Sequence, residues 1–183
     1  MNGQTLERFI TLFRGRGDCY GSWTGGCVKQ PLTSGRFAAH LEGKDPIGVY
    51  PSLNVDGVAR CVWGCTDIDY AGEEGEHDSA SIQAALTHVG VTSWRERTRK
   101  GWHVWVFAAT LVTADEMRRT FLAAHQVVDV QPKEVNPKQT VLTQGQVGNY
   151  VRLPYPDAWG QLNENEPRRI VDNSGGYMEV EDF

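Results

Sequence analysis

The segment VARCVWGCTDIDY, residues 58–70, is a mostly apolar stretch that ends in a pair of aspartates. Its first part is rich in valine, cysteine and tryptophan, which is typical of a buried β-strand. Asp67 and Asp69 are one residue apart, and alternate side chains of a strand share a face, so both carboxylates point the same way. Two like charges side by side repel and resist burial. Their presence at the end of a buried strand therefore indicates a function that needs both.

A hairpin and a helix are predicted on either side of this pair. Residues 47–53 form the partner strand, joined through a turn that contains Asp56-Gly57, a dipeptide typical of tight hairpin turns. After the aspartates, the acidic and glycine-bearing stretch AGEEGEHD reads as a loop. We expect the helix that follows to begin with Asp78 or Ser79 as its N-cap.

A second hairpin, helix and strand follow. Residues 91–98 and 103–109 flank the turn RKGW, residues 113–116 (TADE) form a capping box that opens a helix, and residues 133–137 (KEVNP) form a short strand. From residue 58 onward the order is strand, helix, strand, strand, helix, strand, which is the split βαβ arrangement of ferredoxin-like and RNA-recognition-motif folds. The predicted fold class is therefore α/β, more narrowly α+β.

This topology predicts which residues meet in space. Its first strand lies between the third and the fourth and runs antiparallel to both. The end of the first strand carries Asp67 and Asp69, the third strand begins at His103, and the fourth begins near Glu134. These four side chains should converge at one edge of the sheet.

The length of 183 residues is sufficient for one domain with its own core. We expect a single domain over residues 1–183, with a smaller N-terminal αβ unit at about 1–57, an RNA-recognition-motif-like core at about 58–156 and a polar C-terminal tail at about 160–183. The N-terminal unit should begin with an amphipathic helix over residues 5–13.

Composition excludes several classes of protein. Hydrophobic content of 40% and charged content of 22% are ordinary for soluble proteins, and no apolar run approaches the roughly 18–20 residues that cross a bilayer. The N-terminus lacks the pattern of a secretory signal, which predicts a cytoplasmic protein. A net charge of −5 argues against a surface that binds nucleic acid everywhere. The spacing of Cys19, Cys27, Cys61 and Cys65 fits no standard zinc knuckle, so we expect no structural zinc.

The paired aspartates suit a site for two divalent cations. Carboxylates at i and i+2 of a strand lie about 6.6 Å apart along the backbone, and a third acid opposite them completes a cradle. Hard oxygen ligands favour Mg²⁺ or Mn²⁺, and two such ions stabilise the attacking and leaving oxygens of a phosphoryl displacement. Glu134 is the preferred third acid and Asp129 its rival. The alternative is that the two aspartates form a solvated strand edge.

The second hairpin offers groups for phosphate. Thr98, Arg99 and Lys100 provide a hydroxyl and two cations beside a glycine turn, and His103 opens the next strand. Lys138, a candidate for the nucleotide, and Gln139 follow the bend at Pro137 beside Glu134. Arg152 is a candidate for substrate or template phosphate, with the alternative that it is a surface ion-pair partner.

Taken together, the ordered motifs resemble the archaeo-eukaryotic primase superfamily, in particular the small primase-polymerases of phages, plasmids and mobile elements. The resemblance covers roughly residues 9–156. It rests on the Asp67-Ile68-Asp69 motif, on the turn from Thr98 to His103 and on the strand acid Glu134. The stretches LFRGRGDCYG, HLEGKDPIGVYP and GNYVRLP are similar to flanking signatures of the mobile-element members. Asn136 stands where an aromatic residue is more usual.

The resemblance implies a nucleotidyltransferase that copies single-stranded DNA from ribo- or deoxynucleoside triphosphates with two Mg²⁺ or Mn²⁺ ions, and that synthesises primers in the replication of a phage or mobile element. It implies Asp67, Asp69 and Glu134 as metal ligands, and Thr98, Lys100 and His103 as triphosphate ligands. A helicase or accessory domain would complement the acidic surface. For DNA or the initiating nucleotide, the candidates are Arg14, Arg16 and Tyr20.

Two other classes of function remain as alternatives. A non-catalytic module that binds single-stranded nucleic acid would need aromatic side chains on the open face of the sheet, where Trp63 and Trp105 are candidates. A replication-initiator nickase uses a related sheet with paired histidines, but Trp105 stands at the position of the second histidine.

Overall fold

The computed structural model describes residues 3–158 and 167–183, and in this part of the chain the elements follow the predicted order from residue 58 onward. The helices are α1 (Gly3–Leu12), α2 (Ser34–Leu41), α3 (Gly72–His88) and α4 (Ala114–Val128). The strands are β1 (Tyr20–Ser22), β2 (Cys27–Val28), β3 (Ile47–Val49), β4 (Leu53–Val55), β5 (Val58–Ile68), β6 (Ser93–Arg97), β7 (Trp102–Thr113), β8 (Glu134–Asn136), β9 (Val151–Arg152) and β10 (Arg169–Val171).

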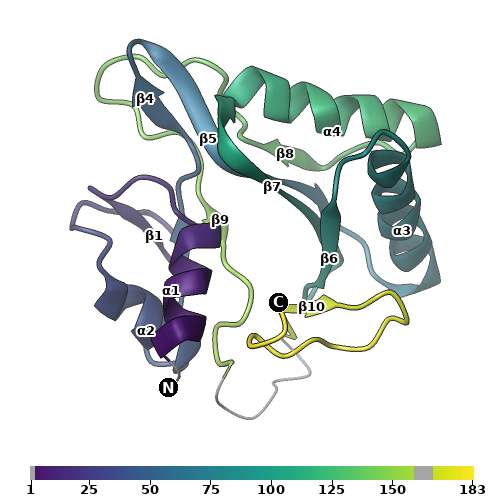
Figure 1. Ribbon diagram of the computed structural model, residues 1–183, viewed down its shortest axis with the longest axis horizontal. Coiled ribbons are helices and arrows are strands. Elements are labelled where there is room, and N and C mark those ends of the chain that lie inside the picture. The colour runs from purple at the N-terminus through teal and green to yellow at the C-terminus, as the bar shows by residue number, and fades with distance from the viewer. Residues whose placement is uncertain (1–2, 159–166) are drawn as a thin grey trace.

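The large sheet has β5 at its centre. Among the described residues its strands are ordered β10-β6-β7-β5-β4, and β8 also pairs with β5. β5 runs antiparallel to both β7 and β8, which confirms the predicted position of the first core strand. Helices α3 and α4 cover one face of this sheet (Figure 1). The arrangement is the α+β fold expected from the order of the elements.

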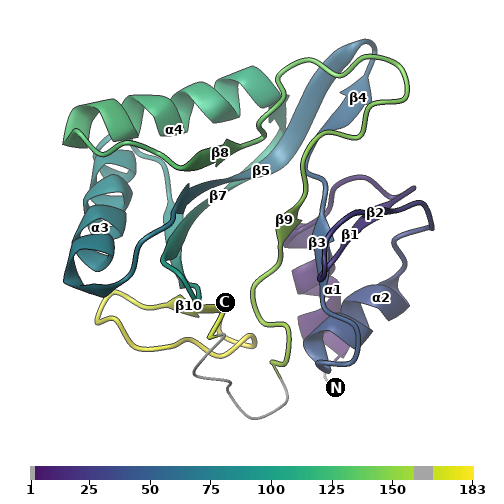
Figure 2. The same cartoon turned by 180° about the vertical axis from the view of Figure 1, so that it is seen from behind.

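A smaller sheet forms the N-terminal unit together with α1 and α2. Its order is β2-β1-β3-β9 in the described residues, so its last strand comes from the chain that follows the core. β9 pairs antiparallel with β3 through Gly48 and Arg152 and lies between the N-terminal unit and the large sheet (Figure 2). The two parts of the chain are therefore joined by a shared strand as well as by the connection at β4.

Two apolar cores lie on the two faces of the large sheet. The core shared with the N-terminal unit contains Phe13, Trp63 and Trp105, and the tryptophans are completely buried. The core beneath the helices contains Ile82 of α3 and Phe121 of α4. Alternation along β5 assigns its side chains to these cores, and it also places the aspartates on the face that the N-terminal unit covers.

The predicted strand at residues 47–53 is divided between the two sheets. β3 joins the small sheet, whereas β4 pairs with β5 through the Asp56-Gly57 turn. Pro51 lies between the two strands and has no backbone N–H with which to continue a ladder. In the turn, Asp56 has φ 52° and Gly57 has φ 80°, as the mirror-image hairpin turns require.

Helix α3 begins earlier than predicted. The stretch AGEEGEHD is helical from Gly72 onward, so neither Asp78 nor Ser79 is the N-cap. Glu73 and Glu74 in the first turn interact favourably with the helix dipole. A side chain at Gly75 would place a Cβ 2.1 Å from the carbonyl oxygen of Tyr70, so glycine at this position lets the helix pack closely against the chain that precedes it.

The predicted capping box is confirmed. Thr113 and Glu116 form the capping box of α4, with the threonine hydroxyl accepting from the Glu116 N–H at 3.1 Å and the Glu116 carboxylate accepting from the Thr113 N–H at 2.9 Å. Gly90 follows α3 with φ 79°.

The C-terminal segment contributes to the large sheet. Residues 160–166 of the predicted polar tail lie outside the described residues. Beyond them β10 pairs antiparallel with β6, and all three of its residues are buried. None of the helices in the described part of the chain has the length and apolar character needed to span a bilayer.

His40 provides a test of how the N-terminal unit is packed. It is completely buried at the end of α2, where its Nδ1 accepts the Ile47 N–H at 3.1 Å and its Nε2–H donates to the Pro154 carbonyl at 2.8 Å. Burial lowers the pKa of this imidazole to about 4. The folded state therefore resists protonation at a pH where the unfolded chain, with an ordinary histidine pKa of about 6.5, already binds the proton.

We expect the free energy of unfolding to fall by about 2–3 kcal/mol through His40 alone as the pH drops from 7 to 4.5. Urea titrations followed by circular dichroism at both pH values measure this loss. His40→Gln cannot be protonated, so its stability should depend less on pH, by that amount. His88→Gln, at an exposed position, is the control. Parallel profiles for wild type and His40→Gln would show the assignment to be wrong.

Candidate active site

The registers of three strands gather the predicted acidic and histidine side chains. Asp67 on β5 lies opposite His103 on β7 and, on its other side, opposite Glu134 on β8. Asp69 follows two residues later on the same face. These side chains come from positions far apart in the sequence, and the antiparallel pairing alone brings them together at the end of β5.

A cavity of about 290 Å³ opens at this end of the sheet. Eight of the predicted residues line it: Asp67, Asp69, Thr98, Arg99, Lys100, His103, Glu134 and Arg152. Lys138 is at its edge, with Nζ 3.2 Å from the Glu134 carboxylate. Gln139 exchanges hydrogen bonds with Asn149, the residue next to the cavity residue Tyr150.

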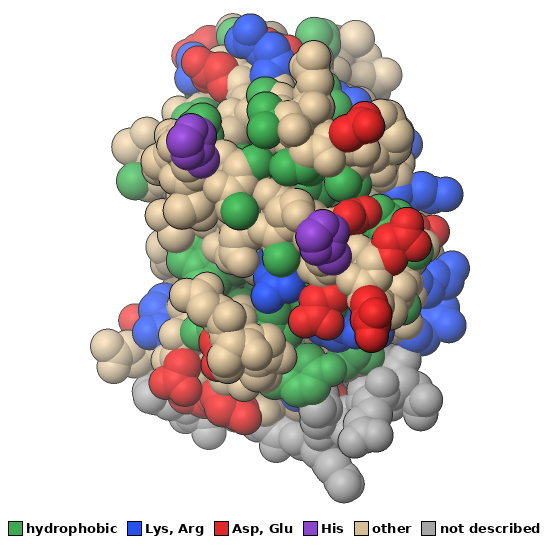
Figure 3. All heavy atoms as spheres, turned by 90° about the vertical axis from the view of Figure 1, so that its right-hand side faces the viewer, with side chains coloured by type: hydrophobic (Ala, Val, Ile, Leu, Met, Phe, Trp, Pro, Cys, Tyr) green, Lys and Arg blue, Asp and Glu red, His purple; other side chains and the backbone are tan. Residues whose placement is uncertain are grey.

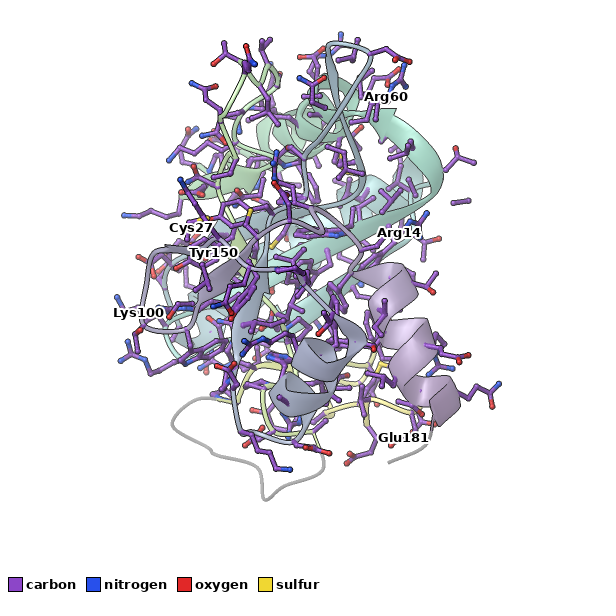
Figure 4. The ribbon with its side chains drawn as sticks, turned by 90° about the vertical axis from the view of Figure 1, so that its left-hand side faces the viewer. Arg14, Cys27, Arg60, Lys100, Tyr150 and Glu181 are labelled. Atoms are coloured by element: carbon purple, nitrogen blue, oxygen red, sulfur yellow. The ribbon has the colours of Figure 1, made fainter. Side chains whose placement is uncertain are left out.

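The other candidates lie elsewhere. Arg14 donates to the carbonyl of Thr11, and in Figure 4 it lies on the opposite side of the view from Lys100 and Tyr150. Arg16 is paired with Asp18 at the surface. Tyr20 is buried beneath the Arg36 guanidinium. None of these residues lines the cavity.

The rival acid is also placed elsewhere. Asp129 is the left-handed C-cap of α4, with φ 56°, and its side chain is exposed. It is not among the residues that line the cavity. Of the two candidates for a third carboxylate, Glu134 is therefore the one that faces Asp67.

Burial and the neighbouring acids both act on the carboxyl group of Asp67. Burial raises the pKa of its carboxyl group, and the negative charges of Asp69 and Glu134 raise it further, while His103 acts in the opposite direction. A group in this position gains most from an added positive charge, because such a charge offsets both the burial and the neighbouring acids. The site is therefore electrostatically suited to cations.

Each carboxylate has a basic side chain nearby. His103 Nε2 is 3.7 Å from Asp67, Lys133 Nζ is 3.9 Å from Asp69, and Lys138 is bound to Glu134. In the described part of the chain, no three potential ligands of the His, Cys, Asp and Glu types are gathered closely enough to form a ready metal site. A metal would have to displace these lysines from the acids.

Two amides hold Glu134 in place. Asn136 donates to its Oε1 at 3.1 Å and Asn149 donates to the same oxygen at 3.4 Å. The Asn136 side-chain oxygen is buried and, within the described residues, has no hydrogen-bond partner, although this residue also lines the cavity. An unsatisfied buried oxygen beside three carboxylates is a further acceptor for a cation or a donor group.

Sequence reasoning missed the residue that orients His103. Glu96 lies opposite it in the hairpin, and its completely buried carboxylate accepts from His103 Nδ1 at 2.8 Å and from Trp105 Nε1 at 2.8 Å. With Nδ1 bound in this way, Nε2 is the nitrogen that faces Asp67 and the cavity. The sequence did contain a signal for this role. In a hairpin with a four-residue turn, Glu96 and His103 fall at paired positions of the two strands.

Arg168 is the second residue that sequence reasoning missed. Its guanidinium is buried, lines the cavity, pairs with Glu96 at 3.1 Å and donates to the Arg152 carbonyl at 2.8 Å. Burial alone would raise the Glu96 pKa, but Arg168 and then His103 outweigh it, so that the pKa of this carboxyl is lowered. No local pattern marked Arg168, because it acts across a long sequence separation.

The aromatic residues considered for base stacking are not available at the surface. Trp63 and Trp105 are both fully buried between the large sheet and the N-terminal unit. Acidic side chains gather on the face formed by α3 (Figure 3), where Glu73, Glu74 and Glu76 are exposed. Clustered negative charge disfavours contact with phosphates on that face, and the sheet face used by stacking modules is covered by the N-terminal unit.

The chain was compared with known families and solved structures. A family model described as "TOTE conflict system, Archaeo-Eukaryotic Primase domain" matches residues 27–166, more than half of the chain. Among solved structures, the chain is similar to the polymerase domain from Mycobacterium tuberculosis Ligase D in complex with DNA, at 12% identity and a TM-score of 0.36. That match covers 60% of this chain and 46% of the other, so the chain spans less than half of that structure. No curated protein matches.

The buried pair of Glu96 and Arg168 should be a large contributor to stability. In Glu96→Ala, the guanidinium of Arg168 remains buried without its counter-charge, so we expect a loss of about 3–5 kcal/mol in the free energy of unfolding. Glu96→Gln can still accept hydrogen bonds and should lose less. Urea titrations measure both. Glu42→Ala removes an acid from an exposed pair with Lys44 and is the control. Equal losses in Glu96→Ala and Glu42→Ala would contradict this role.

Proposed function

Because the chain belongs to the archaeo-eukaryotic primase domain family of TOTE conflict systems, we propose that it is a DNA-dependent primase-polymerase. The proposed reaction transfers a nucleotide from a ribo- or deoxynucleoside triphosphate to a 3′ hydroxyl on a single-stranded DNA template. One observation carries the proposal: three carboxylates line the same cavity as a hairpin turn whose cationic side chains suit phosphate. The fold alone would suit many other functions.

The donor set fits Mg²⁺ or Mn²⁺. The side chains of Asp67, Asp69 and Glu134 offer only hard oxygen ligands, and the pKa of Asp67 is raised by burial first and then by its acidic neighbours, both of which a cation would offset. We assign these three residues as the metal ligands. The chemistry that two bound divalent ions supply is a lower pKa for the attacking hydroxyl and stabilisation of the departing pyrophosphate.

The chain's own residues would bind and orient the triphosphate. Thr98 accepts the Gly101 N–H at 3.1 Å, which fixes the turn that presents Arg99 and Lys100 to the cavity. Cations at this turn neutralise phosphate oxygens. His103, held by the buried Glu96, directs Nε2 toward the same space. Arg168, paired with Glu96 of the same hairpin, adds positive charge beside this turn, and Arg152 also lines the cavity.

In the proposed step, the bond between the 3′ oxygen and the α-phosphorus forms as the bond from that phosphorus to the bridging oxygen breaks. Pyrophosphate leaves toward the Thr98–His103 turn, and the hydroxyl proton passes to solvent. The protein's contribution is positioning and electrostatic stabilisation of charge on the phosphoryl oxygens.

Two features of the molecule disfavour the alternative functions. A stacking module needs exposed aromatic residues on its sheet, but Trp63 and Trp105 are buried. A nickase needs a second metal-binding histidine, but the residue at that position, Trp105, donates its indole N–H to Glu96. An acidic protein that copies DNA gains from a helicase or accessory domain that holds the template, and primer synthesis for a mobile element is the proposed setting.

Removal of any one of the three carboxylates should abolish synthesis. We expect Asp67→Asn, Asp69→Asn and Glu134→Gln each to lower incorporation by at least about 100-fold, because each weakens the stabilisation of charge in the transition state. Chelation of divalent ions with EDTA should have the same effect, and added Mg²⁺ or Mn²⁺ should restore activity. The assay uses labelled nucleotides with primed and unprimed single-stranded DNA.

Asp115→Asn provides the matched control, since Asp115 is an exposed acid that pairs with Arg119 on α4. It should incorporate nucleotides at the wild-type rate. Undiminished incorporation by Asp67→Asn or Asp69→Asn would exclude the proposed site, whereas retained DNA binding in these variants is compatible with it.

A further inference from the structure

A second hollow of about 450 Å³ adjoins the cavity that holds the carboxylates. Tyr150 and Arg152 line both spaces, and Cys27, Tyr50 and Asn149 line only the second. Its volume lies within the range of roughly 300–1,000 Å³ that is usual for small-molecule sites. In Figure 4, Tyr150 and Cys27 are labelled close together on the same side of the molecule as Lys100. The two spaces are therefore neighbours that share a wall.

The ring of Tyr150 rests on two glycines of the small sheet. Gly21 of β1 and Gly48 of β3 are register partners, and a Cβ built on either would come within 2.3 Å of the ring. Alanine at either position could not coexist with the ring in its present place. The backbone of two paired strands thus forms a flat floor that seals one side of the tyrosine.

Further contacts fix the ring on this floor. The Tyr150 hydroxyl donates to the Ser22 carbonyl at 3.2 Å, and Tyr50 packs against the ring at 5.4 Å with an interplanar angle of 64°. Tyr150 is nevertheless only half-buried, because part of it borders the two hollows. A flat aromatic ring that is already immobilised is a platform for a nucleobase, since stacking on it orders few further groups.

Arg152 supplies a cation beside this platform. Its side chain is exposed, lies over the Trp23 ring at 5.2 Å and donates to the Trp23 carbonyl at 2.7 Å. A guanidinium has five N–H donors, and this bond uses one of them. An aromatic platform and an adjacent guanidinium together match the base and the phosphate of one nucleotide.

The platform and the hairpin turn lie on opposite sides of Asp67. Asn149, the residue before Tyr150, donates to Glu134 of β8, which pairs with one edge of β5. The Thr98–His103 turn belongs to β6 and β7, on the other edge of β5. Phosphoryl transfer requires the attacking and leaving oxygens to be roughly in line across the phosphorus. If the pyrophosphate leaves toward the turn, the 3′ hydroxyl approaches from the side of Tyr150.

We propose that the hollow at Tyr150 and Arg152 is the subsite for the nucleotide that provides the 3′ hydroxyl, with its base stacked on Tyr150 and its phosphate bound by Arg152. This inference rests on the proposed function, and it assigns the acceptor side of the same site. Two sources share this chemistry, a free initiating nucleotide and the 3′ end of a primer strand.

Binding of 2′-deoxyadenosine 5′-monophosphate, measured by NMR titration without divalent ions, tests the subsite apart from catalysis. Tyr150→Leu keeps an apolar side chain on the glycine floor but removes the stacking face, so we expect its Kd to rise by about 5- to 100-fold. Tyr150→Phe should restore most of the lost affinity. Tyr177→Leu, which alters an exposed tyrosine outside both hollows, should bind as wild type does.

Gly21→Ala gives an independent test, because the three atoms nearest to the added methyl group all belong to the ring of Tyr150. It should displace the ring without removing it and so weaken binding on its own. Combined with Tyr150→Leu, it should weaken binding little further. Fully additive losses, or unchanged binding in Tyr150→Leu, would overturn the proposal.

Steady-state kinetics separate the acceptor from the donor subsite. Tyr150→Leu should raise the KM for the primer strand or the initiating nucleotide, whereas Lys100→Ala should raise the KM for the triphosphate. A defect of Tyr150→Leu confined to dinucleotide formation on unprimed template identifies the free nucleotide as occupant, and one confined to extension identifies the primer end. A rise only in the triphosphate KM would overturn the assignment.

Failure of the proposed function has a different signature. If the wild-type protein incorporates no nucleotide but binds the monophosphate in a Tyr150-dependent way, the polymerase assignment fails and the nucleotide subsite stands. If it incorporates nucleotides and Tyr150→Leu, with unchanged circular dichroism, does so with unaltered kinetics, the subsite is wrong and the polymerase assignment stands.

Discussion

The antiparallel pairing of β5 with strands on both sides is the constraint on which the site depends. A strand with an open edge could present Asp67 and Asp69 but could not supply a partner on each side of them. Here β7 places His103 opposite Asp67, and β8 places Glu134 opposite it on the other edge. A register slip of one residue in either neighbour would turn those side chains to the helix face of the sheet. The apolar cores on both faces of the sheet penalise such a slip, so packing far from the cavity fixes the geometry within it.

Charge is distributed over this framework in two layers. At the rim, three carboxylates face basic side chains that remain partly in contact with water, and such pairs exchange readily for cations or phosphates. Beneath the rim, Glu96 and Arg168 form a pair that is closed to solvent, and its loss would leave a buried charge. His103 connects the layers, because one ring nitrogen binds the buried acid and the other faces the rim. The exchangeable charges can therefore bind ligands while the buried pair holds the histidine in position.

Sequence patterns predicted the features that depend on local periodicity. The alternation in residues 58–70, the capping box at Thr113 and the hairpin turn before His103 each reflect short-range rules, and together they sufficed for the fold and for the meeting of acids and histidine. The start of α3 was missed because Gly72 and Gly75 resemble loop residues, although Gly75 is required for packing against Tyr70. Glu96 and Arg168 were missed because a buried ion pair between β6 and the chain after the core has no local pattern. Arg14, Arg16 and Tyr20 were selected by residue type alone, and their own neighbours hold them elsewhere.

The return of the chain to the N-terminal unit explains why the cavity has two dissimilar walls. The hairpin wall is rigid because it is part of the large sheet, and it carries cations without aromatic platforms. The opposite wall exists only because β9 adds to β3, which brings Tyr150 over Gly21 and Gly48. A larger residue at either glycine would move the ring, and at Gly48 it would also meet the Val151 carbonyl of β9, whereas the nearest atoms to a side chain at Gly21 all belong to Tyr150. Gly21 in particular therefore leaves room for a ring that lines the cavity, which is what the proposed platform for a nucleobase requires.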